Sequence, residues 1–155
     1  MIDEVRKLMA SLRGEKVVKV VVGPAGVHYD FGPEQKSPAL IVRYGVLSNT
    51  SITIHSSQRQ RLLGIAPFPP FSCQDALGKV LVGKTVTEAD FDEKKNAARI
   101  ILDGNLLLSL VPTAEDEGVY WSVYYWPSGP LGKIRDGFVI TADSIERVKA
   151  EGVQS

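Results

Sequence analysis

Two stretches of this 155-residue chain share the pattern Leu-x-Gly-x-x-Val at a constant offset of 69 positions. The first is Leu12–Val17 and the second is Leu81–Val86. In each stretch, apolar residues at helical intervals precede the glycine, and β-branched residues follow it. Glycine commonly ends a helix, so each stretch predicts a helix, a glycine stop and a strand. Recurrence in the same order predicts an internal duplication.

The first predicted unit, residues 3–55, is a helix followed by an antiparallel meander. Ile2, Val5, Leu8 and Leu12 form the apolar stripe of a short amphipathic helix. After Gly14, β-branched and alternating segments indicate strands. The predicted strands cover residues 16–22, 27–31, 40–46 and 51–55.

The second predicted unit, residues 72–111, begins after the proline-rich segment 64–71, which prevents regular structure. It repeats the same order, with a short helix closed by Gly83 and then a meander. Asp103-Gly104 is a typical hairpin turn between two of its strands. The predicted strands cover residues 85–91, 97–102 and 106–111.

The remaining segment, residues 119–152, is predicted to form a strand, a turn, a second strand and a helix. The strands cover residues 119–126 and 138–141. Thr141 or Asp143 can cap the final helix, which Gly152 would end.

These elements predict a single α+β domain over residues 1–155. At 44% hydrophobic residues, the chain has enough apolar surface to fill a core. If the duplication is real, the two units pair about a pseudo-twofold axis. Their strands then merge into one curved, mostly antiparallel sheet, with short helices packed on it and an additional C-terminal helix.

Charge and cysteine content restrict the classes of partner and compartment. Eighteen basic residues balance eighteen acidic ones, so no overall field favours nucleic acid, and Arg59 with Arg61 is too small a basic patch. The lone Cys73 fits a reducing compartment. The N-terminus lacks the apolar run of a signal peptide or membrane span, so we expect a cytoplasmic protein. Low net charge permits a monomer, a weak homodimer or a standing partner.

Sequence motifs give little support for catalysis. The usual bases are limited to His28 and His55, both on predicted strands, where a surface role is more common. Cysteine and histidine spacings do not match a zinc site, and the glycines do not form a nucleotide-binding loop. We therefore expect no cofactor, no metal and no enzymatic activity. The alternative is a small-ligand-binding or hydrolytic domain, with His28 or His55 beside a sheet pocket lined by Tyr29, Tyr44 and Trp121.

The most unusual text is the aromatic strand at residues 119–126, preceded by three consecutive acids. Its rings fall on both faces of the strand, and exposed aromatic clusters are costly unless they bind something. Tyrosine and tryptophan also dominate protein-binding hot spots. A solvated acidic turn and a central strand covered on both faces are the structural alternatives. The predicted partner-binding residues are Glu115, Asp116, Glu117, Tyr120, Tyr124 and Trp126.

The twice-repeated segments 12–17 and 81–86, followed by the aromatic segment 120–129, resemble small bacterial immunity proteins of polymorphic or contact-dependent toxin systems. The resemblance implies a cytosolic, non-enzymatic protein that occludes a cognate toxin. It also implies a protein partner, possibly a basic toxin domain, and contact through surface charge and aromatic anchors.

Overall fold

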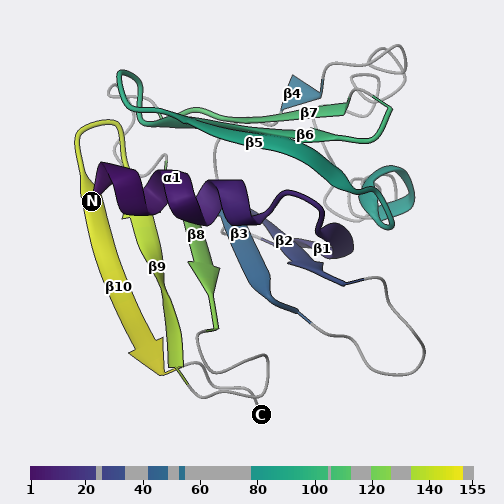
Figure 1. Cartoon of the computed structure of the whole chain (residues 1–155), viewed down its shortest axis with the longest axis horizontal. Coiled ribbons are helices and arrows are strands. Elements are labelled where there is room, and N and C mark those ends of the chain that lie inside the picture. Colours follow the sequence, from purple (N-terminus) through teal and green to yellow (C-terminus); the bar gives the residue numbers. More distant parts are fainter. Residues whose placement is uncertain are drawn as a thin grey trace.

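The fold is α+β and dominated by antiparallel strands (Figure 1). The computed structural model describes residues 1–23, 26–33, 42–48, 53–54, 78–104, 106–112, 120–126 and 134–151. In chain order, its elements are α1 (Ile2–Ser11), β1 (Lys16–Gly23), β2 (Gly26–Gly32), β3 (Tyr44–Ser48), β4 (Thr53–Ile54), β5 (Val86–Asp92), β6 (Ala97–Leu102), β7 (Leu106–Leu110), β8 (Trp121–Tyr125), β9 (Ile134–Ile140) and β10 (Ile145–Glu151).

The strands form two sheets. A six-stranded sheet has the order β1-β2-β3-β8-β9-β10, and a four-stranded sheet has the order β4-β7-β6-β5. The prediction of one merged sheet is therefore wrong. Helix α1 crosses the six-stranded sheet and lies beside β5, so it packs against both sheets (Figure 1). We call the face of the six-stranded sheet toward α1 its inner face, and the opposite face its outer face.

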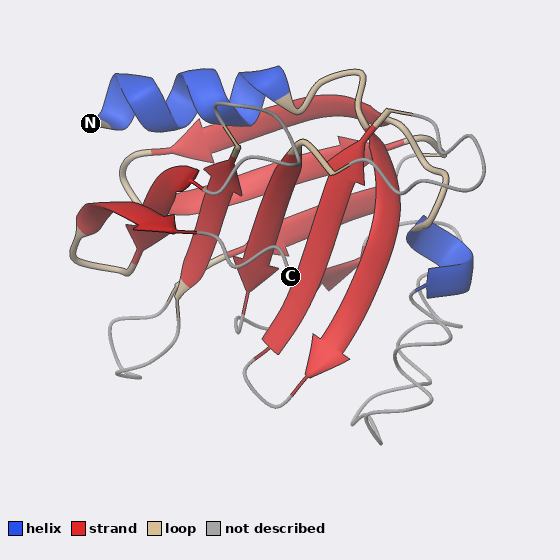
Figure 2. Cartoon of the chain, turned by 90° about the horizontal axis from the view of Figure 1, so that it is seen from below, coloured by secondary structure: helices blue, strands red, loops and turns tan. Residues whose placement is uncertain are grey.

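Helix α1 confirms the predicted stripe, because Val5, Leu8 and Met9 are buried and Leu12, just beyond its end, is buried too. The core continues between the sheets, where the Phe91 and Trp121 rings have centroids 6.0 Å apart. Figure 2, turned by 90°, shows the strands with α1 along one side and the short helical segment that includes residues 78–81. In the part of the chain the structure describes, no helix is long and apolar enough to cross a membrane.

The two Leu-x-Gly-x-x-Val stretches pair with each other. The amide of Gly14 donates to the Val86 carbonyl over 2.8 Å, and the amide of Gly83 donates to the Val17 carbonyl over 2.8 Å. The two glycines have φ values of +87° and +89°, a conformation that favours glycine. The two bonds are equivalent to each other, because the donors Gly14 and Gly83 are 69 positions apart and so are the acceptors Val17 and Val86.

The same offset relates two strand irregularities. The β1–β2 register shifts between Val17 and Lys19, and the β5–β6 register shifts between Val86 and Glu88. Beyond this joint, the first unit continues into a six-stranded sheet with β8, β9 and β10, whereas β5, β6 and β7 form a separate sheet with β4. Two whole helix-and-meander repeats are therefore not what the fold shows. Of the second predicted helix, residues 78–81 are described and helical.

The predicted C-terminal helix is wrong, because Ile145–Glu151 forms strand β10 and pairs with β9 along its whole length. The capping signal is real but serves a turn. The Thr141 hydroxyl accepts hydrogen bonds from the amides of Asp143 and Ser144, while the Thr141 amide donates to the Ser144 carbonyl over 2.9 Å. Threonine makes the same local bonds at helix starts and in turns, so the motif could not distinguish the two.

Candidate functional site

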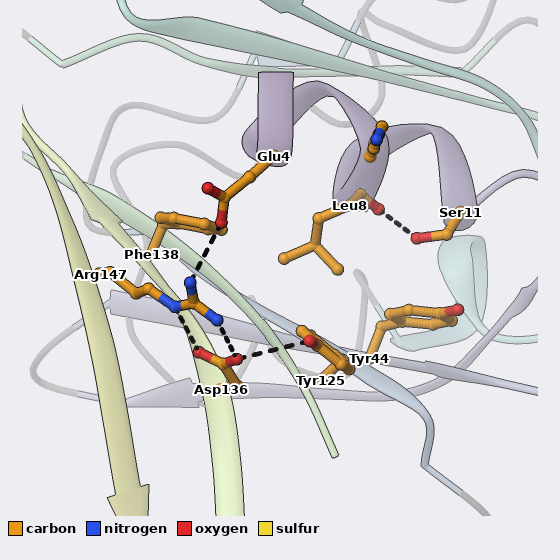
Figure 3. A pocket seen from close by; sticks show the side chains of 9 residues that line it. Glu4, Leu8, Ser11, Tyr44, Tyr125, Asp136, Phe138 and Arg147 are labelled. Carbon is orange, nitrogen blue, oxygen red and sulfur yellow. Dashed lines mark hydrogen bonds and ion pairs between the residues drawn. The ribbon is translucent and has the colours of Figure 1, made fainter. Parts of the chain in front are cut away.

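A cavity of about 310 Å³ lies between α1 and the inner face of the six-stranded sheet (Figure 3). Small-molecule sites have volumes of roughly 300 to 1,000 Å³, so this cavity is at the lower end of that range. We call it the α1 cleft. It is lined by Glu4, Lys7, Leu8, Ser11, Tyr44, Tyr125, Asp136, Phe138 and Arg147.

Strand register places the floor of the α1 cleft. Tyr44 on β3 is opposite Tyr125 on β8, which in turn is opposite Asp136 on β9. Directly opposite residues point to the same face of a sheet, so these three side chains form one row. Phe138, two residues after Asp136 on β9, is the register partner of Arg147 on β10. Four neighbouring strands thus contribute side chains to one site.

Arg147 joins the sheet to the helix through two carboxylates. Its Nε and Nη2 atoms donate to the two Asp136 oxygens over 3.3 Å and 2.9 Å, and its Nη1 atom donates to Glu4 over 3.2 Å. The Tyr125 hydroxyl donates to Asp136 over 3.4 Å. Asp136 is only 4% exposed. Figure 3 shows the two Arg147 bonds and the Tyr125 bond meeting at the Asp136 carboxylate, with the Glu4 bond on the other side of the guanidinium.

These contacts set the protonation states of Asp136 and Tyr125. Hydrogen bonds from Arg147 hold the pKa of Asp136 below its usual value, although burial opposes them. Burial raises the pKa of Tyr125, and the neighbouring Asp136 charge raises it further. Near neutral pH these groups are therefore a carboxylate and a neutral phenol. Neither is poised to exchange a proton with a substrate, so the arrangement suits binding better than acid–base chemistry.

Some polar groups on the α1 side of the cleft also have hydrogen-bond partners. The Ser11 hydroxyl donates to the Leu8 carbonyl over 2.6 Å, and Glu4 is bound by Arg147. Within the described ranges, neither the Lys7 ammonium nor the Tyr44 hydroxyl has a hydrogen-bond or ion-pair partner. These two groups remain available to a ligand.

A second cluster lies on the outer face, where the Arg135 guanidinium sits 4.3 Å from the centroid of the Tyr124 ring. The same ring makes edge contacts with Trp126, at 5.4 Å between centroids, and with His28, at 5.6 Å. Residues Tyr124, Trp126, Arg135 and His28 are hereafter the outer-face cluster. Gly45, opposite Tyr124 on β3, leaves the space that the Tyr124 ring fills.

Two polar atoms of the outer-face cluster are buried without a hydrogen-bond partner in the described structure: His28 Nε2 and Trp126 Nε1. Burial lowers the pKa of His28, and the charges of Arg135 and Lys19 lower it further against the opposing effect of Asp30. Burial in turn raises the pKa of Asp30. The His28 ring is therefore uncharged near neutral pH.

Two of the predicted partner-binding residues meet in the described structure. Tyr124 and Trp126 meet on the outer face, but Tyr124 is only 7% exposed, so Trp126 and Arg135 are its more accessible neighbours. Tyr120, the residue before β8, is half-buried. Glu115–Glu117 lie outside the described residues.

The alternative pocket beside a histidine does not coincide with the α1 cleft. Tyr44 lines the α1 cleft, whereas His28 is on the opposite face of the sheet. Trp121 is fully buried, and its Nε1 donates to the Asn96 carbonyl over 2.9 Å. Tyr29 is buried in the core. His55, Cys73, Arg59 and Arg61 lie outside the described residues.

Sequence reasoning missed Glu4, Lys7, Asp136, Arg147 and Arg135. Reading residues 145–151 as a helix concealed that Arg147 and Lys149 share one face of a strand. The predicted strand at 138–141 began too late to include Asp136, so the need of a charge on a covered face for a partner gave no signal there.

Across the described ranges, no three His, Cys, Asp or Glu side chains are grouped so that they could hold a metal ion. No protein-family model matches the chain, and neither a curated protein nor a solved structure matches it significantly.

Proposed function

We propose that this protein is a non-enzymatic protein-binding module, an immunity protein of the cytoplasm that neutralises a toxin by occluding it. The observation that carries the proposal is the outer-face cluster. Tryptophan, tyrosine and arginine are the residue types most enriched in protein-binding hot spots. Here Arg135 and Trp126 each contact the Tyr124 ring on the outer face of the sheet.

Within this surface, Tyr124 acts as a support and Trp126 and Arg135 act as contacts. The Tyr124 ring is buried, and it holds the Arg135 guanidinium above it and the Trp126 ring at its edge. A supported side chain loses less rotamer freedom on binding, which favours affinity. The partnerless Trp126 Nε1 could also gain a hydrogen bond if docking repositions the indole.

The acidic segment Glu115–Glu117 supplies the expected charge component. It precedes β8, the strand that carries Tyr124, by a few residues in the sequence. Complementary charge increases association rates and excludes wrong partners. We therefore expect a partner whose binding surface is basic around an apolar centre.

The groups of the α1 cleft support a non-enzymatic role. The Asp136 carboxylate is held by Arg147, and the pKa of Tyr125 is raised, so neither is a ready base or nucleophile. The hydrolytic alternative used His28 or His55. His28 would act from the outer face, where burial lowers its pKa and Nε2 is covered, and His55 lies outside the described residues.

The first test replaces Trp126 with alanine. The partner is first isolated by a pull-down with the full-length protein, and the measurement is its binding by calorimetry together with growth of cells that express both proteins. We expect the affinity to fall at least about 30-fold and protection to be lost, as for a hot-spot tryptophan. Lys94→Gln, at an exposed turn, is the matched surface control. Unchanged affinity for the Trp126 variant would assign docking to another surface.

The second test reverses the charge of Glu115, Asp116 and Glu117 together, each to lysine. We expect the association rate to fall at least about tenfold at low salt, with a smaller effect at high salt, because surface charges steer encounter. Stopped-flow measurements over a salt series would show this. An association rate that stays the same in both salts would remove the acidic segment from the interface.

A further inference from the structure

Some charged side chains around the α1 cleft are in ion pairs and others are not. Arg147 compensates Glu4 and Asp136 through the bonds described above. Lys149 lies close enough for its charge to lower the pKa of Asp136. Counting Lys7, there are three cations against two carboxylates at or beside the cleft, a formal excess of +1 (3 − 2). An anionic group would balance that excess.

We propose that the α1 cleft binds a small organic carboxylate that has an apolar body, with the carboxylate between Lys7 and Tyr44. This ligand site goes beyond the proposed role of the outer face and uses the opposite face of the same sheet. Lys7 supplies a charged donor and Tyr44 a neutral hydroxyl donor, and both lack partners within the described structure. Charge-assisted hydrogen bonds of this type are the strong ones in polar recognition.

The remaining walls favour an apolar body over a second charge. Leu8 from α1 and Phe138 from β9 line the middle of the cleft, and the rings of Tyr44 and Tyr125 line the sheet side (Figure 3). At about 310 Å³, the space suits a single ring or a short aliphatic chain. The Asp136 end is already saturated by Arg147, which discourages a cationic ligand there.

Two sources could supply this chemistry: a free aryl or alkyl carboxylic acid, or the C-terminal carboxylate of a peptide with an apolar last residue. The shared requirement is one carboxylate next to an apolar group of about ten heavy atoms. Separate probes distinguish the sources. Hydrocinnamate represents the free acid, and N-acetyl-leucyl-phenylalanine represents the peptide terminus.

The experiment is a titration of nitrogen-15 labelled full-length protein, followed by amide chemical shifts. We expect hydrocinnamate to give saturable shifts at residues 7–11 of α1 and at Tyr125 and Phe138, with a Kd in the millimolar range or tighter. Hydrocinnamide and phenylpropylamine, which keep the ring but lack the carboxylate, should bind at least about tenfold more weakly. Stronger binding of the dipeptide than of its C-terminal amide would assign the peptide source.

Two variants test the assigned contacts. Lys7→Gln removes the charge and Tyr44→Phe removes only the hydroxyl, and each should weaken hydrocinnamate binding, the former about tenfold or more. Lys94→Gln, an exposed lysine in the β5–β6 turn, should leave it unchanged. A dispersed amide spectrum confirms that each variant is folded. The proposal is overturned if no saturable shifts occur, if the shifts lie outside the cleft, or if the amine binds as well as the acid.

Each result is separable from the fate of the toxin-binding proposal. Trp126 and Lys7 are on opposite sides of the six-stranded sheet, so Trp126→Ala should leave hydrocinnamate binding intact, and Lys7→Gln should leave toxin binding intact. Failure of the hydrocinnamate experiment would therefore leave the toxin-binding proposal standing, and failure of the toxin-binding experiment would leave the ligand-site proposal standing.

Discussion

Replacing Gly137 with alanine is expected to destabilise the protein by about 3 kcal/mol or more, or to prevent folding. Gly137 on β9 is the register partner of Tyr124 on β8. A methyl group at this position would meet the Val123 carbonyl oxygen and would lie 2.6 Å from Cβ and 2.7 Å from Cα of Tyr124. These are mostly backbone atoms that cannot rotate away, so the pairing of β8 with β9 would have to open.

Urea unfolding followed by circular dichroism would measure this effect. Gly78→Ala is the matched control, because a methyl group there meets no atom within 4 Å and the residue lies in a helical segment. Alanine should be neutral at that position or stabilise by up to about 1 kcal/mol. A Gly137→Ala protein as stable as wild type would show that the β8–β9 pairing is looser than described.

Arg147→Leu is expected to produce the second large effect, because it leaves Asp136 buried without its cation. Asp136 is 4% exposed and receives two of the hydrogen bonds that Arg147 donates. Only the carboxylate of this pair is buried, because the Arg147 side chain is 46% exposed. Removing Arg147 leaves the Asp136 charge desolvated without its cation, which is destabilising. The thermal midpoint at neutral pH should therefore fall well below that of wild type.

The effect of Arg147→Leu should depend on pH in a defined direction. In the wild type, the pKa of Asp136 is lowered on folding, so its stabilising contribution is present above about pH 4, the unfolded value, and is lost as pH falls through the folded pKa. In the variant, burial without Arg147 raises that pKa, so protonation relieves the cost. The difference in stability between the two proteins should shrink from pH 7 to pH 3.

Arg99→Leu provides the control for an exposed pair. Arg99 bonds Asp90 over 2.9 Å, but their side chains are 58% and 54% exposed. Such exposed pairs contribute about 1 kcal/mol or less to stability, and breaking one leaves no buried charge behind. If Arg147→Leu costs no more than Arg99→Leu, and the difference from wild type is the same at both pH values, the Asp136 network is not a source of stability.

Local features of the sequence were sufficient to predict much of the fold. The apolar stripe over residues 2–12 predicted α1, and period-two alternation predicted β2 within a residue or two. The shared Leu-x-Gly-x-x-Val text predicted helix stops, and both glycines have the positive φ expected of them. Each of these signals depends on residues within a few positions of one another.

The candidate site was predicted less well because it depends on pairing between distant strands. Tyr124 and Trp126 were correctly placed on one face, although β8 ends at Tyr125, but Arg135 enters the outer-face cluster from β9. The α1 cleft joins the first turns of the chain to β10, as in the bond between Glu4 and Arg147. No periodicity within either segment indicates that these residues meet.

The sequence alone therefore determined where the chain turns helical or extended near its glycine stops, and which residues share a face within one element. Only the tertiary structure decided that the strands divide into two sheets and that residues 145–151 form a strand. The Thr141 turn allowed either outcome locally, and full pairing with β9 selected the strand. The physical reason is that side-chain direction follows from local backbone geometry, whereas strand order depends on contacts between segments far apart in the sequence.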